Sequence, residues 1–169
     1  MAEAKGPWPH TTTYQTRWLD NDQYGHLNNS TYYLVADSII NAFLVNECGI
    51  QPFVHASSSA PSSCPSTPSE KSVSEIVGLV ISNSCRYYAS CSFPQPLTVG
   101  LRVVTLGKSS VTYQVSIAES RAEGREVAAV ITSTHVFVDR VTRRPVQMPR
   151  RLREPLSRLL VLEEARSKL

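Results

Sequence analysis

The sequence lacks the features that mark several large classes of protein. Its 17 Lys and Arg residues against 14 Asp and Glu residues give a net charge of only +3, too weak a bias to predict a nucleic-acid-binding face. No apolar run approaches the roughly 18 residues required of a membrane-spanning helix, and the first residues lack the apolar core of a signal peptide. We therefore expect a protein that is not secreted, has no membrane span and binds no nucleic acid.

Cysteine is also scarce, and its spacing carries no metal or redox signature. The cysteines are Cys48, Cys64, Cys85 and Cys91. They form no CxxC pair, and no histidine lies at zinc-finger spacing from them. We predict free thiols in a reducing compartment, with neither a zinc site nor a redox motif.

The residues that are present predict one compact α+β domain spanning 1–169. Of the 169 residues, 41% are hydrophobic, which is enough for one real core. Threonines and aromatics predict a first strand over 11–18, and apolar residues at three- and four-residue steps predict a long helix over 30–48. Further strands are predicted at 75–92, 98–107, 111–117 and 126–139, with a turn at Glu123-Gly124 and an amphipathic helix after Pro149. This order indicates a curved antiparallel sheet of about five strands around a central helix, followed by a C-terminal helix.

A Ser/Pro-rich segment at about 54–73 interrupts this pattern. Its composition cannot bury enough apolar area to offset the entropy lost on ordering. We expect a mobile insertion there rather than a domain boundary.

The most unusual stretch is the polar loop at 17–29, between the first strand and the long helix. It contains Asp20, Asp22, Gly25, His26, Asn28 and Asn29. The start of a helix offers unpaired backbone N–H groups and a partial positive charge, which can hold a developing oxyanion while a nearby carboxylate attacks or directs water. The chain has no Gly-x-Ser-x-Gly elbow, so a carboxylate mechanism is favoured over a Ser–His–Asp triad.

The loop also resembles the motif of a known enzyme family. Asp22-Gln-Tyr-Gly25-His26-Leu-Asn28-Asn29-Ser-Thr-Tyr32 is similar to the Asp-x-x-Gly-His-x-Asn-Asn-x-x-Tyr pattern of hotdog-fold thioesterases of the 4-hydroxybenzoyl-CoA thioesterase type. Asp37 and the late segment Arg143-Arg144-Pro145-Val146 match as well, and the resemblance covers about 11–155. It implies the hotdog fold and hydrolysis of an acyl-CoA thioester to a free carboxylic acid and coenzyme A.

Two alternatives to this activity stay open. One is another hotdog acyl-CoA enzyme, such as an enoyl-CoA hydratase, although the Asn-Pro-containing motif of that branch is absent from the sequence. The other is a non-catalytic acyl-CoA-binding or oligomerisation protein. The motif does not specify the acyl group.

The resemblance gives the catalytic residues their roles. Asp22 is expected to react, either as a nucleophile or as a general base, the alternative being that it only caps the loop or neutralises Arg17. Gly25 lets the backbone approach the substrate closely, and the backbone N–H of Asn29 is the oxyanion donor. His26 either orients Asp22 and water or shapes the loop. Asp20, outside the matching register, is expected to be structural.

Substrate contacts are predicted for Tyr24, Asn28 and Tyr32. Asn28 is favoured as a helix cap or loop brace over a catalytic group, with Asn29 as the other candidate cap. Tyr32 lies on the packed apolar stripe of the helix, so packing is its first expected role. The candidates for the phosphates of coenzyme A are Arg86, Arg102, Lys108 and the Arg143-Arg144 pair, among which the sequence does not choose. The resemblance further implies no metal or redox cofactor, and a homodimer or homotetramer with active sites at subunit interfaces.

The last three residues, Ser167-Lys168-Leu169, match the peroxisomal import tripeptide. They predict recognition by the peroxisomal import receptor and a peroxisomal location. An ordinary polar helix end, and a cytoplasmic protein, is the alternative.

Overall fold

The computed structural model describes residues 4–51, 73–120 and 126–161. Three sequence-based predictions therefore fall outside the described residues. They are the turn at Glu123-Gly124, the C-terminal tripeptide at 167–169 and, apart from its last residue, the Ser/Pro-rich insertion at 54–73.

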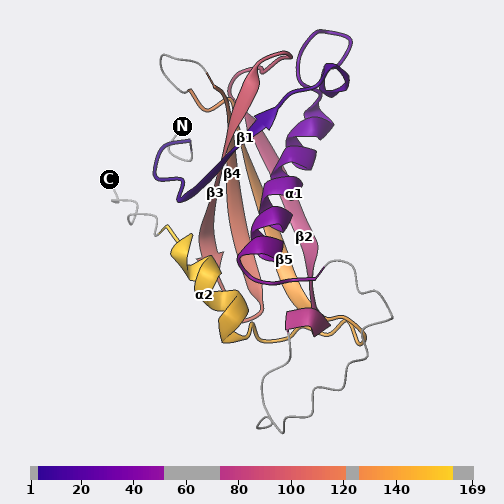
Figure 1. The fold of residues 1–169 in the computed structure, drawn as a ribbon, viewed down its shortest axis with the longest axis vertical. Coiled ribbons are helices and arrows are strands. Elements are labelled where there is room, and N and C mark those ends of the chain that lie inside the picture. Colours follow the sequence, from indigo (N-terminus) through magenta and orange to yellow (C-terminus); the bar gives the residue numbers. More distant parts are fainter. Residues whose placement is uncertain (1–3, 52–72, 121–125, 162–169) are drawn as a thin grey trace, which may run out of the picture.

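The described chain forms an antiparallel sheet and two helices. In chain order the elements are β1 (His10–Gln15), α1 (Asn29–Asn46), β2 (Ile76–Tyr87), β3 (Pro96–Leu106), β4 (Ser110–Glu119), β5 (Ala129–Asp139) and α2 (Arg150–Arg158). The five strands pair in the order β1-β3-β4-β5-β2, and α1 lies along one face of the curved sheet (Figure 1). The predicted α+β architecture, including the C-terminal helix, is confirmed.

The core lies between α1 and the sheet. Every third or fourth residue of the helix, including Tyr32, Ala36, Ile39 and Phe43, is buried there, which is the periodicity expected of a helix with one apolar side. The opposite side of α1 is open, and the side chain of Leu34 is 61% exposed. Within one chain, the sheet therefore covers one side of the helix only.

Both ends of α1 are set by residues suited to those places. Asn28 precedes the helix in an extended conformation, and its side-chain oxygen accepts a hydrogen bond from the Ser30 N–H. At the other end Gly49 has a φ of 72°, which turns the chain out of the helix and lets the Ile50 N–H donate to the Leu44 carbonyl oxygen. Asn28, rather than Asn29, is thus the cap.

β1 ends at Gln15 rather than at Trp18 as predicted. The reason is Asp20, whose carboxylate accepts a 2.7 Å hydrogen bond from the Arg17 N–H while its own N–H donates to the Arg17 carbonyl oxygen. These bonds close a short 3₁₀ turn over Trp18–Asp20 and take the chain away from the sheet. Trp18 consequently projects from the molecule with 78% of its surface exposed.

α2 packs beside β3 through the buried side chains of Leu152 and Leu156. The chain after the helix continues along the strand, because the Val103 N–H donates to the Leu159 carbonyl oxygen and the Val161 N–H donates to that of Val103. No helix within the described ranges is long and apolar enough to cross a membrane.

Candidate active site

The loop between β1 and α1 is built on the buried carboxylate of Asp20. Its Oδ2 accepts hydrogen bonds from the Arg17 N–H at 2.7 Å and the Tyr14 hydroxyl at 2.8 Å, and its Oδ1 accepts from Arg17 Nη2 at 2.8 Å. The backbone carbonyl oxygen of Asp20 accepts from the Asn28 N–H, and the Thr31 hydroxyl donates to the same oxygen. One residue thus ties the strand, the loop and the start of the helix together, which is the structural role expected for Asp20.

The protonation of Asp20 follows from these contacts. Burial alone raises the pKa of a carboxyl group, but the hydrogen bonds from Arg17 and Tyr14 together outweigh it. The pKa of Asp20 therefore lies below its ordinary value, and the carboxylate is charged at neutral pH. Burial, followed by the hydrogen bond to Asp20, also raises the pKa of the Tyr14 hydroxyl, which stays a donor.

The tip of the loop, Asp22–His26, is a tight turn closed by its own backbone. The Asp22 N–H donates to the His26 carbonyl oxygen at 2.8 Å, and the Gly25 N–H donates to that of Asp22 at 3.1 Å. The Asp22 Oδ1 accepts from the N–H groups of Tyr24 and His26 at 2.8 and 3.3 Å. Oδ2 has no hydrogen bond among the described residues, so one carboxylate oxygen is fixed and the other is available for chemistry.

Gly25 allows the chain to make this turn. Its φ of 81° lies in the left-handed region, where residues with a side chain are strained. A Cβ added at this position would meet no atom within 4 Å, so the requirement is conformational rather than steric.

The start of α1 presents a free donor next to this loop. The Asn28 Oδ1 accepts from both the N–H and the hydroxyl of Ser30, and the Thr31 N–H donates to the Asn28 carbonyl oxygen. The Asn29 N–H, at the first helical position, has no acceptor in the part of the chain that the structure describes. It combines an unpaired N–H with the positive end of an 18-residue helix.

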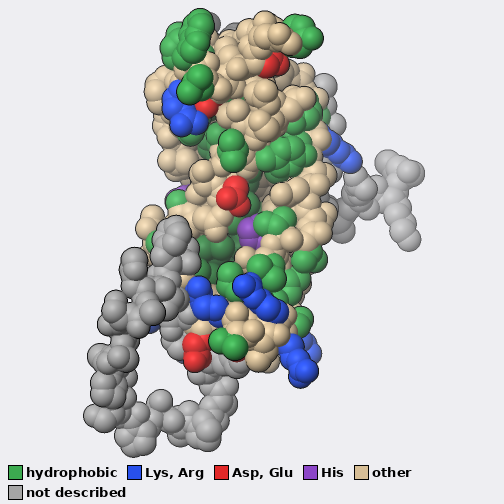
Figure 2. All heavy atoms as spheres, turned by 90° about the vertical axis from the view of Figure 1, so that its right-hand side faces the viewer, with side chains coloured by type: hydrophobic (Ala, Val, Ile, Leu, Met, Phe, Trp, Pro, Cys, Tyr) green, Lys and Arg blue, Asp and Glu red, His purple; other side chains and the backbone are tan. Residues whose placement is uncertain are grey.

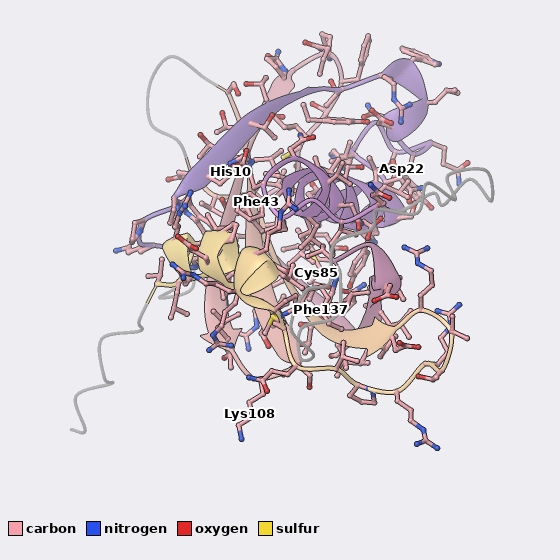
Figure 3. The ribbon with its side chains drawn as sticks, turned by 60° about the horizontal axis from the view of Figure 1, so that its bottom comes forward. His10, Asp22, Phe43, Cys85, Lys108 and Phe137 are labelled. Carbon is pink, nitrogen blue, oxygen red and sulfur yellow. The ribbon has the colours of Figure 1, made fainter. Side chains whose placement is uncertain are left out.

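The structure brings five of the predicted site residues into one exposed stretch. Asp22 is half-buried, while Gly25, His26 and Asn29 are exposed and Tyr24 is 78% exposed. The side chain of His26 makes no hydrogen bond within the described residues. Figure 3 shows Asp22 on the opposite side of α1 from His10.

Tyr32 packs in the core on the apolar side of α1 and does not lie at the surface of the loop. The residue is 2% exposed, its ring meets that of Tyr87 edge-on at 5.1 Å, and its hydroxyl accepts a 3.3 Å hydrogen bond from the Cys91 N–H. Burial and Cys91 raise the pKa of the hydroxyl. Tyr32 therefore supports the helix start from the core, and within this chain it exposes almost no surface that a substrate could contact.

A groove of about 470 Å³ opens beside Asp22, and sequence reasoning missed two of its walls. Trp18 and Leu19 line it together with Asn21, Asp22, Gln23 and Gly25. Trp18 and Leu19 are 78% and 89% exposed, and the Trp18 ring contacts Phe93 edge-on. In the sequence, the two residues stand as an apolar pair ahead of two acidic residues. The predicted first strand took in Trp18, so the pair was not recognised as part of the site. The carboxylate of Asp22 thus borders an apolar surface suited to a hydrocarbon group.

One candidate for phosphate binding is placed elsewhere. Arg102 is 5% exposed, donates to the Gln114 side-chain oxygen at 2.6 and 2.9 Å, and stacks on Trp8 with 4.2 Å from its Cζ to the ring centroid. Its guanidinium is committed to the β3–β4 region, so Arg102 is not a surface phosphate ligand.

Together, the site offers a carboxylate, a helix-terminal N–H donor and an apolar wall. No group of three or more His, Cys, Asp or Glu side chains within the described ranges is arranged to hold a metal ion. The carboxylate can attack or activate water, and the N–H can stabilise an oxyanion formed on a carbonyl carbon.

Comparison with known proteins shows which protein family this chain matches. The model of the thioesterase-like superfamily matches residues 16–156, which include the loop, α1 and the whole sheet apart from β1. A comparison with curated proteins gives no match.

Solved structures share the fold over most of their length. The PA5185 protein of Pseudomonas aeruginosa is 38% identical, with 89% of this chain and 91% of that chain covered and a TM-score of 0.74. A 1,4-dihydroxy-2-naphthoyl-CoA thioesterase from Synechocystis is 14% identical, with 87% and 94% covered and a TM-score of 0.65. A Staphylococcus aureus protein solved in complex with CoA is 12% identical, with 94% and 92% covered and a TM-score of 0.68. The expected hotdog thioesterase fold is confirmed.

The contacts of Asp20 generate a pH-dependent prediction. Because the pKa of Asp20 is lower in the folded state, its charge stabilises the fold at neutral pH, and this stabilisation is lost as the pH falls through the folded-state pKa. Asp20→Asn should therefore lower the free energy of unfolding by about 2–4 kcal/mol at pH 7 and by clearly less near pH 3. Urea unfolding at both pH values measures the difference, with the exposed Asp37→Asn as the control. An equal effect of Asp20→Asn at both pH values would contradict the prediction.

Proposed function

Because the chain belongs to the thioesterase-like superfamily, we propose that it hydrolyses an acyl-CoA thioester to a free carboxylic acid and coenzyme A. The observation that carries the proposal is the carboxylate of Asp22, held in a turn directly ahead of the unpaired N–H at the start of α1. Among the structural neighbours, one is a CoA thioesterase and one was solved with CoA.

In this mechanism the thioester carbonyl lies between Asp22 and the Asn29 N–H. Attack on the carbonyl carbon places negative charge on its oxygen, and the Asn29 N–H at the positive end of the helix stabilises that charge. The attacking group is either the free Oδ2 of Asp22, giving a mixed anhydride that water then hydrolyses, or a water molecule that Asp22 deprotonates. In both routes the carbon–sulfur bond breaks, and coenzyme A leaves as a thiolate that takes up a proton.

The acyl group is proposed to lie on the apolar wall beside Asp22. Trp18 and Leu19 supply this surface. Asn28 acts there as the cap that orients the helix start, and Gly25 keeps the turn open to the substrate.

We also propose that two copies of the chain associate through the edge of β2. Within the described chain, β2 pairs with β5 on one side and has no partner strand on the other. Its first half exposes Leu79, Val80 and Ile81, at 37%, 47% and 63%. Figure 2 shows hydrophobic side chains among polar ones on the side of the molecule that carries α1 and β2. A long apolar edge strand is a template for pairing with another chain, so a dimer is favoured, with a tetramer of such dimers as the alternative.

The first test of the activity is thiol release by the native chain and by Asp22→Asn. The substitution retains the Oδ1 that organises the turn but removes the charge, so it should lower the rate by ~10²- to 10⁴-fold with the fold intact. The assay uses aliphatic acyl-CoAs of increasing length and an aromatic set. A hydratase or a non-catalytic binding protein would release no thiol from any of them, and full activity of Asp22→Asn would remove Asp22 from the mechanism.

The oxyanion donor can be tested at the backbone. Asn29→Pro removes the N–H at the first helical position, where proline is well tolerated, and Asn28 already has the extended conformation that a following proline requires. The rate should fall by ~10²- to 10³-fold. Asn29→Ala keeps the N–H and is the matched control, and circular dichroism checks the helix in both variants. Equal rates for the two variants would show that this N–H does not hold the oxyanion.

The location is proposed to be the peroxisome, with the import receptor recognising Ser167, Lys168 and Leu169. Acyl-CoA metabolism in that organelle suits the proposed activity. A fluorescent protein fused ahead of residue 1 leaves the tripeptide exposed and should give punctate fluorescence that coincides with a peroxisomal marker. Deletion of the three residues should make it diffuse. Diffuse fluorescence of the intact fusion would instead support a cytoplasmic protein.

A further inference from the structure

We infer that Asn21 is a positioning residue for the reaction: its side-chain amide holds the Asp22 turn against the connection between β2 and β3, and so fixes the carboxylate relative to the Asn29 N–H. The inference rests on the proposed function, in which these two groups act on the same thioester carbonyl. Asn21 lies between Asp20 and Asp22 and stands outside the motif that the resemblance covers.

The Asp22 turn is the tip of a small hairpin outside the main sheet. Asn21 and Leu27 face each other across it as an isolated antiparallel bridge. One backbone hydrogen bond lies on either side of the bridge, and the one nearer the tip joins the Asp22 N–H to the His26 carbonyl oxygen at 2.8 Å. A lone two-stranded hairpin is only marginally stable in water. The position of Asp22 therefore depends on what the two arms of the hairpin are attached to.

Both arms of the hairpin are attached to the β2–β3 connection, residues 88–95. In the first arm, the Asn21 Oδ1 accepts a 3.1 Å hydrogen bond from the Phe93 N–H. In the second arm, the Leu27 N–H donates to the Cys91 carbonyl oxygen at 2.7 Å. One segment of the chain thus supports the hairpin on both sides of its bridge.

The connection is itself anchored to the rest of the fold. In its middle, the Ser92 N–H donates at 3.0 Å to the side chain of Glu119, which is buried at the end of β4. At its end, the Gln95 carbonyl oxygen accepts a 2.8 Å hydrogen bond from the buried Thr16 hydroxyl, directly after β1. These bonds tie the connection to two strands of the sheet, so it is a fixed support for the hairpin.

The other end of the Asn21 amide holds the tip of the turn. Its Nδ2 donates to the Gly25 carbonyl oxygen at 3.1 Å. Among the described residues, the Asp22 carboxylate bonds only to the N–H groups of Tyr24 and His26, which belong to the same turn. The carboxylate therefore moves with the turn, and the Asn21 side chain links that turn to its support.

An amide suits this place because it donates and accepts at the same time. Asn21 directs its oxygen to the Phe93 N–H and its nitrogen to the Gly25 carbonyl oxygen, so one planar group joins the support to the turn. A carboxylate of the same shape could only accept, and an aliphatic side chain could do neither. The rate is sensitive to this link, since a displacement of about 1 Å in a reacting group can cost ~10²-fold.

Asn21→Leu removes both hydrogen bonds with little change in side-chain size. kcat for an acyl-CoA should fall by ~10- to 100-fold with little change in KM, because the carboxylate loses its position while the apolar wall of Trp18 and Leu19 stays. Thr16→Val is the matched control, since it removes a hydrogen bond to the same connection at Gln95 without touching the turn. It should lower the thermal stability but leave kcat nearly unchanged. A higher KM at constant kcat, or an equal loss of kcat in Thr16→Val, would overturn the inference.

Asn21→Asp separates positioning from stability. The carboxylate still accepts from the Phe93 N–H but cannot donate to the Gly25 carbonyl oxygen. In about 0.5 M salt, which screens the added charge, Asn21→Asp should unfold at a temperature closer to that of the native chain than Asn21→Leu does. Its kcat should nevertheless be as low as that of Asn21→Leu. If kcat instead follows the stability of the native chain and the two variants, the role of Asn21 is structural only.

Hydrogen exchange in the turn separates this role from the proposed function, because it needs no turnover. The Tyr24 and His26 amides, which donate to the Asp22 carboxylate, should exchange at least ~10-fold faster in Asn21→Leu, while the amide of the buried Ile39 in α1 should not change. Unchanged exchange in the turn would overturn the inference while thiol release by the native chain upheld the activity. Absence of thiol release from every thioester would overturn the activity, while faster exchange would still support Asn21 as the link that holds the turn.

Discussion

The buried carboxylate of Asp20 is the constraint on which the site depends. It gathers the Arg17 N–H, the Arg17 guanidinium and the Tyr14 hydroxyl, while its backbone carbonyl oxygen holds the start of α1. A charge this deeply buried is favourable only when its hydrogen bonds are complete, so the surrounding chain has little freedom to move. The neighbouring Asp22 can therefore keep one oxygen free at an exposed position. Asp20 thus orders the loop, and Asp22, two residues away, carries the carboxylate that we propose to react.

Much of the architecture could be predicted because it follows from the local periodicity of apolar residues. The three- and four-residue spacing of Tyr32, Ala36, Ile39 and Phe43 predicted α1, and its end came within two residues because Gly49 suits a left-handed turn. Alternation likewise predicted β4 and β5. The first strand was predicted too long because Trp18 has a high strand propensity. Propensity does not include the hydrogen bond from the Arg17 N–H to the Asp20 carboxylate, which closes the turn over Trp18–Asp20.

The candidate site was predictable only in part. A motif in consecutive residues located Asp22, Gly25, His26 and Asn29 in one stretch, and the structure places the first three in the loop and Asn29 at the first position of α1. Contacts between distant segments carried no such signal. The Phe93 N–H donates to the Asn21 side-chain oxygen and the Leu27 N–H donates to the Cys91 carbonyl oxygen, so the β2–β3 connection supports the loop from the far side. Tertiary packing produces these bonds and buries Tyr32 and Arg102. The spacing of residues along the chain does not encode such packing.

The left-handed backbone conformation at Gly25, and not a lack of space for a side chain, limits which residues fit this position. Its φ is positive, yet nothing lies within 4 Å of the place where a Cβ would stand. An L-alanine there would strain the backbone, whereas a D-alanine, the mirror-image residue, adopts a positive φ naturally. It would also narrow the range of unfolded conformations. Chemical synthesis of the chain with D-alanine at position 25 would thus give a stiffer loop with the same path.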